Sequence, residues 1–138
     1  MQYWLITANP GSKTRNGWNW TNTKKVGDVE KWVAETKNGG KKVNYDNVER
    51  FDKVVCYSSG KDKKIVALAE ITNGRHYSIE DEIKVIDIKK TEDVKTPLSY
   101  YDMKENEVFD RLCSKGIMQS TITKIYENEY DEIIKLTR

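Results

Sequence analysis

The chain has 138 residues, of which 37% are hydrophobic and 33% are charged, and its formal net charge is +2. Four Trp, eight Tyr and two Phe supply far more aromatic surface than a disordered chain carries, and a chain of this length is one domain by default. No apolar run approaches the roughly 18 residues of a membrane span, and the start lacks the basic flank of a signal peptide. The composition therefore predicts one globular domain over residues 1–138, in the cytoplasm and without a membrane partner.

The chain opens with a predicted strand at residues 2–8 (QYWLITA), whose β-branched and aromatic side chains are typical of a buried strand. Asn9 and Pro10 end it, because proline cannot donate a hydrogen bond to a sheet ladder. The loop that follows is rich in Gly, Asn, Thr and Lys, yet it carries Trp18 and Trp20.

The middle of the chain contains the clearest strand patterns. Residues 30–36 and 41–45 predict a hairpin around the Asn-Gly-Gly turn at 37–40. Residues 53–58 (KVVCYS) and 65–72 (IVALAEIT) predict the two strongest strands, which a short polar turn joins.

The second half of the chain mixes strands and helices. Residues 82–90 alternate as a half-exposed strand. The other predicted elements are a short helix or turn starting at 96–97, an amphipathic helix at 105–114, a strand at 120–125 and a helix at 127–136, capped by Asn128 or by its acidic residues. About six strands with inserted helices predict an α+β fold, a curved mixed β-sheet or small β-barrel with flanking helices.

Signals for catalysis are weak. The only histidine, His76, lies in a turn-like NGRHYS segment with no Ser or Cys beside it in sequence. No phosphate-binding loop, dinucleotide motif or zinc ligand set is visible. Cys56 and Cys113 lie far apart and are interpreted as reduced core thiols. We therefore predict a protein that is not an enzyme and needs no metal or cofactor.

Positive charge is concentrated in the first third of the chain. Residues 11–42 hold eight Lys and Arg against three Asp and Glu, whereas residues 43–138 hold sixteen against nineteen. A polyanion would be drawn to this third, although a solvated lysine-rich face is the alternative. Contacts with a nucleic-acid backbone are expected from Lys13, Arg15, Lys24, Lys25, Lys41 and Lys42.

Aromatic and polar side chains near strand ends are the candidate ligand-binding groups. Trp18 and Trp20 are expected to be exposed or half-exposed, and two Trp beside basic residues suit stacking on a base; the alternative is a Trp that plugs an open barrel end. Tyr57 and Ser58 end a strong strand, where they either read the polar edge of a base or form the turn. The amide of Asn9 has the same two interpretations.

Four blocks of the sequence, in order, resemble the EVE domain family. They are YWLITANP, DKVVCYSSGKDKKIVALAEIT, TPLSYYDMK and MQSTITKIYENEYDEIIKL. The resemblance covers essentially the whole chain and implies the PUA-like fold, which also includes the YTH readers of methyladenine in RNA. The sequence looks most similar to EVE domains at the N-terminus of McrB-type modification-dependent restriction proteins, in which a separate motor and nuclease cut the DNA.

The resemblance implies an aromatic cage that accepts a flipped base. Trp18 and Trp20 match the loop that gives a cage wall, and His76 or Tyr77 takes the place of a Trp found in YTH readers. The implied base-binding residues are Trp18, Trp20, Asn9, Tyr57, Ser58 and His76.

The implied function is non-catalytic recognition of a flipped methylated cytosine or methyladenine in double-stranded DNA. The domain would supply the specificity of a restriction system in phage defence, with an AAA+ GTPase motor and a nuclease as partners. Three alternatives remain open: a PUA-like protein that binds RNA or a modified nucleotide, a small nucleotide-processing enzyme, and a protein–protein adaptor.

Overall fold

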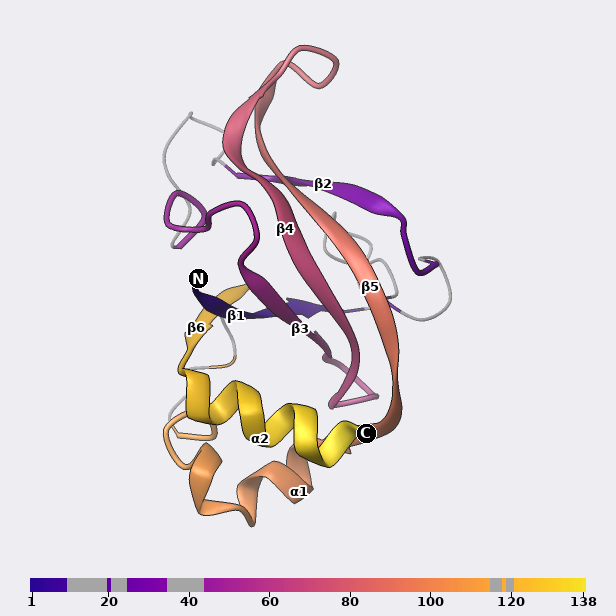
Figure 1. The fold of residues 1–138 in the computed structure, drawn as a ribbon, viewed down its shortest axis with the longest axis vertical. Coiled ribbons are helices and arrows are strands. Elements are labelled where there is room, and N and C mark those ends of the chain that lie inside the picture. The colour runs from indigo at the N-terminus through magenta and orange to yellow at the C-terminus, as the bar shows by residue number, and fades with distance from the viewer. Residues whose placement is uncertain (10–19, 21–24, 35–43, 115–117, 119–120) are drawn as a thin grey trace.

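A computed structural model describes residues 1–9, 20, 25–34, 44–114, 118 and 121–138. Among these residues the strands form one six-stranded sheet in the order β2-β5-β4-β3-β1-β6, with helices packed at one end (Figure 1). The strands are β1 (Tyr3–Ala8), β2 (Val29–Val33), β3 (Lys53–Ser58), β4 (Lys64–Ser78), β5 (Ile83–Ser99) and β6 (Ile122–Ile125), and the helices are α1 (Tyr100–Lys104), the 3-10 helix η1 (Glu107–Phe109) and α2 (Glu127–Thr137). This arrangement confirms the predicted α+β class, a curved mixed sheet with flanking helices.

β1 and β3 form the parallel pair of the sheet, whereas the other neighbouring strands run antiparallel. The register pairs Thr7 with Tyr57 and Ala8 with Ser58. Because parallel strands end at the same edge of a sheet, the polar residues that follow both strands lie side by side.

Strands β4 and β5 form a long antiparallel pair whose far end projects as an arm beyond the rest of the sheet (Figure 1). Their register shifts at four places, between Ile65 and Ala67 and at three further points along β4. Extra residues of this kind bend a strand and increase its twist, which gives the sheet its curvature.

Two apolar clusters form on the two faces of the sheet. Successive β1 residues alternate between them, because strand side chains point to opposite faces: Trp4 and Ile6 join the first cluster and Leu5 the second. The first also contains Trp20 and Trp32. The second is covered by the helices, through Met103, Phe109 and Ile133 among others.

Two predicted elements differ from the structure. β2 pairs with β5, with Trp32 opposite Ile86, and Asn44 and Tyr45, the last two residues of the predicted return strand, lie in a turn. Residues 41–43 of that strand lie outside the described residues. The predicted turn at 37–40 lies outside the described residues. Pro97 lies within β5, which continues to Ser99 before the chain becomes helical.

Other predicted elements change in length or kind. His76 lies in β4 rather than in a turn, since this strand continues to Ser78. The expected amphipathic helix at 105–114 is the short η1 followed by turns, although Phe109 and Leu112 are buried as expected. Helix α2 begins after Tyr126, whose backbone N–H donates to the Glu129 carboxylate at 2.7 Å.

The described helices include none long and apolar enough to cross a membrane. Cys56 is buried in the first cluster, Cys113 is half-buried, and both are free thiols.

Candidate functional site

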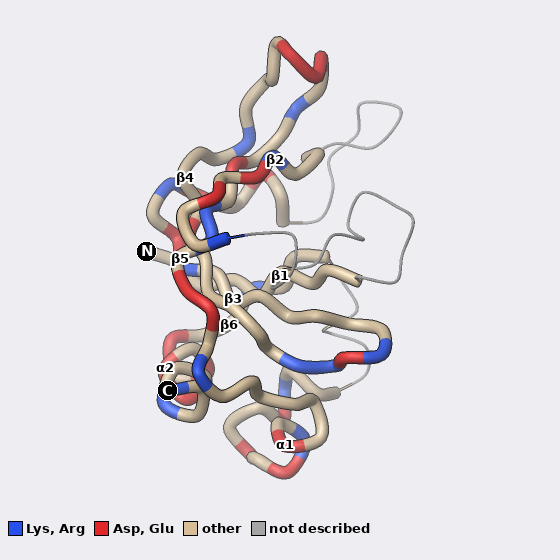
Figure 2. Tube along the Cα trace, turned by 90° about the vertical axis from the view of Figure 1, so that its right-hand side faces the viewer, with Lys and Arg blue, Asp and Glu red and all other residues tan. Residues whose placement is uncertain are grey.

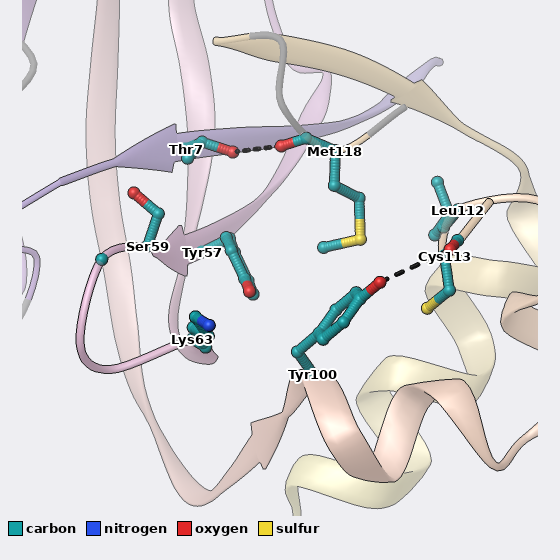
Figure 3. Close-up of a pocket in the computed structure, with 9 residues that line it drawn as sticks. Thr7, Tyr57, Ser59, Lys63, Tyr100, Leu112, Cys113 and Met118 are labelled. Carbon is teal, nitrogen blue, oxygen red and sulfur yellow. Dashed lines mark hydrogen bonds between the residues drawn. The ribbon is translucent and has the colours of Figure 1, made fainter. Parts of the chain in front are cut away.

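A cavity of about 430 Å³ opens where β1 and β3 end, between the sheet and the helical layer (Figure 3). Its volume falls within the range of small-molecule sites. The described residues that line it are Thr7, Tyr57, Ser59, Gly60, Lys63, Tyr100, Leu112, Cys113 and Met118.

The sheet edge is fixed by hydrogen bonds between the two parallel strands and the chain that follows them. The backbone N–H and the hydroxyl of Ser59 both donate to the carbonyl oxygen of Ala8, at 2.9 and 3.3 Å. The Thr7 hydroxyl donates to the carbonyl of Met118 at 3.5 Å. The end of β1 therefore holds both the β3–β4 turn and the residue at the opposite wall.

The β3–β4 turn requires a glycine at its tightest point. Gly60 has φ +73°, and a Cβ atom placed there would lie 2.7 Å from Oδ1 of Asn9. Asn9 therefore packs against the turn at the edge of the cavity, although it does not line the cavity.

Two tyrosines point into the cavity from opposite elements (Figure 3). Tyr57 comes from β3 and is only 6% exposed, and Tyr100 opens helix α1. The Tyr100 N–H donates to the carbonyl of Lys63 at 2.8 Å, and its hydroxyl donates to the carbonyl of Cys113 at 3.4 Å. The two rings are held by separate segments, and both line the cavity.

Among its described residues, the inner side of the cavity is uncharged, whereas the rim carries a positive charge. Burial raises the pKa of Tyr57 to about 12, with smaller contributions from Tyr100 and Cys113. Burial also raises the pKa of the Cys113 thiol. Both groups are therefore uncharged at neutral pH, and the charge among the described lining residues comes from the exposed Lys63.

Tyr57, Ser58 and Asn9 are brought together at this edge. Tyr57 lines the cavity, and Ser58 is 3% exposed with its hydroxyl donating to Asp62 at 2.9 Å. Ser58 thus stabilises the turn, one of the two interpretations of this residue.

Trp20 lies elsewhere, on the other face of the sheet. It is 1% exposed and stacks on Trp32, with ring centroids 5.9 Å apart and planes at 16°. Its carbonyl accepts a hydrogen bond from the buried Lys90 ammonium at 2.5 Å. The expectation of an exposed or half-exposed Trp20 is therefore wrong, because the residue is buried in the first cluster.

His76 is also remote from the cavity, because it lies on the β4 arm. Its Nδ1 lies 2.7 Å from the Gly74 carbonyl, and its Nε2 lies 3.7 Å from the Asp87 carboxylate. Lys25 is exposed, and its backbone N–H donates to the Asp28 carboxylate. Trp18, Lys13, Arg15, Lys24, Lys41 and Lys42 lie outside the described residues.

Sequence patterns missed most of the cavity. Tyr100, Leu112, Cys113 and Met118 come from segments that only the fold places opposite β3. The basic segment SSGKDKK was visible in the sequence. It carries Lys61 and Lys63 in the turn between β3 and β4, and Lys64 at the start of β4. Within the described parts of the chain, no cluster of three or more His, Cys, Asp and Glu side chains is placed to bind a metal ion.

The curved mixed sheet with flanking helices, which holds the cavity at the ends of β1 and β3, is an EVE/PUA-like fold. The profile of the EVE domain matches residues 2–136, so the chain belongs to the EVE domain family. No protein of curated function matches the sequence.

Solved structures share this fold at low sequence identity. Protein Atu2648 from Agrobacterium tumefaciens is 20% identical, with a TM-score of 0.74 over 99% of this chain and 93% of that one. Protein PSPTO5229 from Pseudomonas syringae is 14% identical, with a TM-score of 0.75 over 99% of each chain. Human THYN1, solved in complex with DNA containing 5-methylcytosine, is 13% identical, with a TM-score of 0.72 over 100% of this chain and 98% of that one.

Proposed function

We propose that this domain binds a modified base of DNA, flipped out of the duplex, in the cavity between Tyr57 and Tyr100. The observation that carries the proposal is this cavity, at the ends of β1 and β3, with an aromatic ring on either side. Membership of the EVE family and the likeness to THYN1 with 5-methylcytosine DNA support a DNA ligand.

The lining chemistry suits a flat heterocycle. Stacking of a base on an aromatic side chain contributes about 1–3 kcal/mol, which is enough to offset much of the cost of unstacking it from the duplex. The hydroxyl of Ser59 and the backbone of Gly60 lie beside the rings and offer polar groups to a base edge. A modified base is then favoured by the contact its added group makes.

Positive charge lies next to the cavity. Lys61 and Lys63 are exposed and Lys64 half-buried on the β3–β4 turn, where Figure 2 shows basic positions on either side of one acidic position. Lysines in this place would hold the phosphates that flank a flipped nucleotide. Lys25, Lys13, Arg15, Lys24, Lys41 and Lys42 remain proposed phosphate contacts, and Trp18 remains a proposed base contact. Trp20, which is buried on the other face of the sheet, and His76, which lies on the β4 arm, are not proposed to contact a base in this cavity.

We propose that the domain acts by binding and not by catalysis. The described lining residues contain a thiol whose pKa is raised and no carboxylate or imidazole, so a general base of ordinary pKa does not face the ligand there. By the sequence resemblance, the domain would supply specificity to a modification-dependent restriction system, with an AAA+ GTPase motor and a nuclease as cytoplasmic partners.

The test is fluorescence-polarisation binding to matched duplexes with one unmodified cytosine, 5-methylcytosine, 5-hydroxymethylcytosine, 4-methylcytosine or 6-methyladenine. We expect one modified duplex to bind at least tenfold more tightly than its unmodified counterpart, the scale that one methyl group provides. Equal binding to all five would overturn the proposal.

Two variants connect the binding to the cavity. Tyr100→Leu removes a ring and should weaken binding of the preferred duplex by about tenfold or more, since one stacking contact is worth about 1–3 kcal/mol. Tyr100→Phe keeps the ring and should bind like the wild type. Tyr101→Leu is the matched control, because Tyr101 is the neighbouring residue, is 65% exposed and is not among the lining residues.

A further inference from the structure

We infer that the cavity selects a base whose added group is a small apolar one, such as methyl, over a base whose added group carries a hydroxyl. The inference rests on the proposed function and specifies which modification the same cavity accepts. It follows from a division of the cavity into a polar, cationic rim and an apolar floor that contains two sulfur atoms.

The rim consists of exposed and polar residues of the β3–β4 turn. Gly60 and Lys63 are exposed and Ser59 is half-buried. The ammonium of Lys63 makes this side the entrance for a nucleotide, because its phosphates remain at the surface while the base enters. The edge of the base that points away from its phosphates then faces the side of the cavity opposite Lys63.

The opposite side is apolar. Leu112 is 1% exposed and Met118 is 8% exposed, and both line the cavity beside the half-buried Cys113. In Figure 3 the Met118 side chain extends toward Tyr100, with Leu112 and Cys113 beyond it and Ser59 and Lys63 on the other side of Tyr57. Thioether and thiol sulfur atoms are weak hydrogen-bonding groups, so this floor suits a methyl group.

Two backbone carbonyl groups of the floor already accept hydrogen bonds. The Met118 carbonyl accepts from the Thr7 hydroxyl at 3.5 Å, and the Cys113 carbonyl accepts from the Tyr100 hydroxyl at 3.4 Å. Burial raises the pKa of the Cys113 thiol, so the floor carries no thiolate at neutral pH. A hydroxyl on the added group would lose its water there, and it would have to share these carbonyl oxygens with the Thr7 and Tyr100 hydroxyls.

The size of the selection follows from the behaviour of apolar pockets. Such a pocket rejects an analogue with an added hydroxyl by about a hundredfold at most. We therefore expect a duplex with 5-hydroxymethylcytosine to bind about tenfold to a hundredfold more weakly than the methylated duplex that binds best. The preference should not change between pH 6 and 8, because the floor groups do not titrate there.

Cys113 allows the floor to be changed without changing its size. Cys113→Ser replaces the sulfur by a hydroxyl that donates and accepts well, and it should narrow the preference for methyl over hydroxymethyl by about fivefold or more. Cys113→Val keeps the position apolar and should retain the preference. Both proteins are first compared with the wild type by circular dichroism and thermal unfolding, and the ratio of the two Kd values is then measured for each.

The outcomes separate the inference from the proposed function. A methylated duplex that binds best in the wild type, with a smaller preference in Cys113→Ser only, supports the inference. A hydroxymethylated duplex that binds as well or better, with both tighter than unmodified DNA, overturns the inference and leaves the proposed function standing. Equal binding of modified and unmodified duplexes overturns both, and an equal preference in Cys113→Ser and Cys113→Val overturns the assignment of the floor.

Discussion

Lys63 is the charged residue among the described residues that line the cavity, and it is exposed, so it is the first candidate for a phosphate contact. Each phosphate contact contributes about 0.9 to the slope of log K against log salt for duplex DNA. Lys63→Gln should lower the magnitude of this slope by about 0.9 while leaving the preference for the modified base intact. The slope is measured by fluorescence polarisation between 50 and 200 mM salt.

The matched control for this charge is Lys135→Gln, which removes a lysine from α2 with a side chain that is 78% exposed. Its salt dependence should equal that of the wild type. A loss of slope in Lys135→Gln equal to that in Lys63→Gln would show that net charge, and not a contact at the rim, governs binding.

Two glycines with positive φ offer a second test at the residue scale. Gly60 and Gly27 have φ of +73° and +96°, but a Cβ at Gly60 meets Asn9 whereas one at Gly27 meets nothing within 4 Å. Alanine in left-handed conformation costs about 1–2 kcal/mol at either site. Gly60→Ala should also displace Asn9 and weaken binding of modified DNA, whereas Gly27→Ala should bind normally. Equal affinities in the two variants would remove Asn9 and its turn from the site.

The position of Tyr57 at the sheet edge was predictable from the sequence, because this residue lies near the end of a strong apolar strand. Its role in binding a base stays a prediction. The position of Trp20 was not predictable, because a polar loop gives no sign that one of its residues returns to the interior to stack on Trp32. Tyr100 and Met118 were not predicted to line a binding site. They line the cavity only because the fold brings distant segments of the chain together, and no local sequence pattern indicates such a contact.

At the element scale, the alignment of β1 with β3 depends on Asp52, which is 1% exposed. Its carboxylate accepts from the backbone N–H of Gln2 at 2.9 Å and from the Trp4 indole at 2.8 Å. It also accepts from the backbone N–H of Glu49 at 2.8 Å. These bonds connect the start of β1 to the residue before β3.

Asp52→Asn places an amide N–H₂ among these donors. Hydrogen bonds to a charged acceptor contribute about 1.5–3 kcal/mol, so we expect the free energy of unfolding in urea to fall by about that amount. The exposed Asp131→Asn should change it by less than about 0.5 kcal/mol. An unfolding free energy of Asp52→Asn equal to that of the wild type would contradict this account of the network.

Element patterns predicted strands better than their partners. β3 matches its prediction residue for residue, because a short apolar run between polar turns has few interpretations. β4 and β5 extend well beyond their predicted C-terminal ends. The second half of each strand is polar and shows no alternation of apolar and polar residues, so these segments carry no strand signal. The pairing of β2 with β5 joins residues that are far apart in sequence, from Val29 with Lys89 to Val33 with Val85, and nothing in the local pattern of β2 indicates it.

At the scale of the whole molecule, the buried acidic groups predict an alkaline limit to stability. Burial raises the pKa of Cys56 well above its ordinary 9.0, and it raises that of Tyr57 from 10.0 to about 12 and that of Tyr45 further. Above these ordinary values the unfolded chain releases protons that the folded chain retains, so unfolding becomes more favourable as pH rises.

We therefore expect the urea midpoint to stay level between pH 7 and 8 and to fall between pH 9 and 11, measured with a reducing agent present. Cys56→Ala should be less stable at pH 7, because it leaves a small cavity, and should lose less between pH 8 and 10. A midpoint that rises or stays level up to pH 11 would contradict the pKa directions given for these groups.

Acidic and basic residues are concentrated at different places in the fold. Figure 2 shows acidic positions at the end of the β4–β5 arm and basic positions on the β3–β4 turn. Lys63 of this turn lines the cavity. The fold class was predictable because the order of strand and helix patterns survives local errors. The cavity was not, since it is assembled from β1, β3, the turn after β3, α1 and the segment after η1.

The most direct test of the central claim is a crystal structure of this domain with a short duplex that carries one modified base of the kind it binds best. The account predicts that this base lies outside the helix stack, between the rings of Tyr57 and Tyr100, with its added group toward Leu112 and Met118. A modified base that stays stacked in the duplex, or one that lies against another surface of the protein, would contradict it.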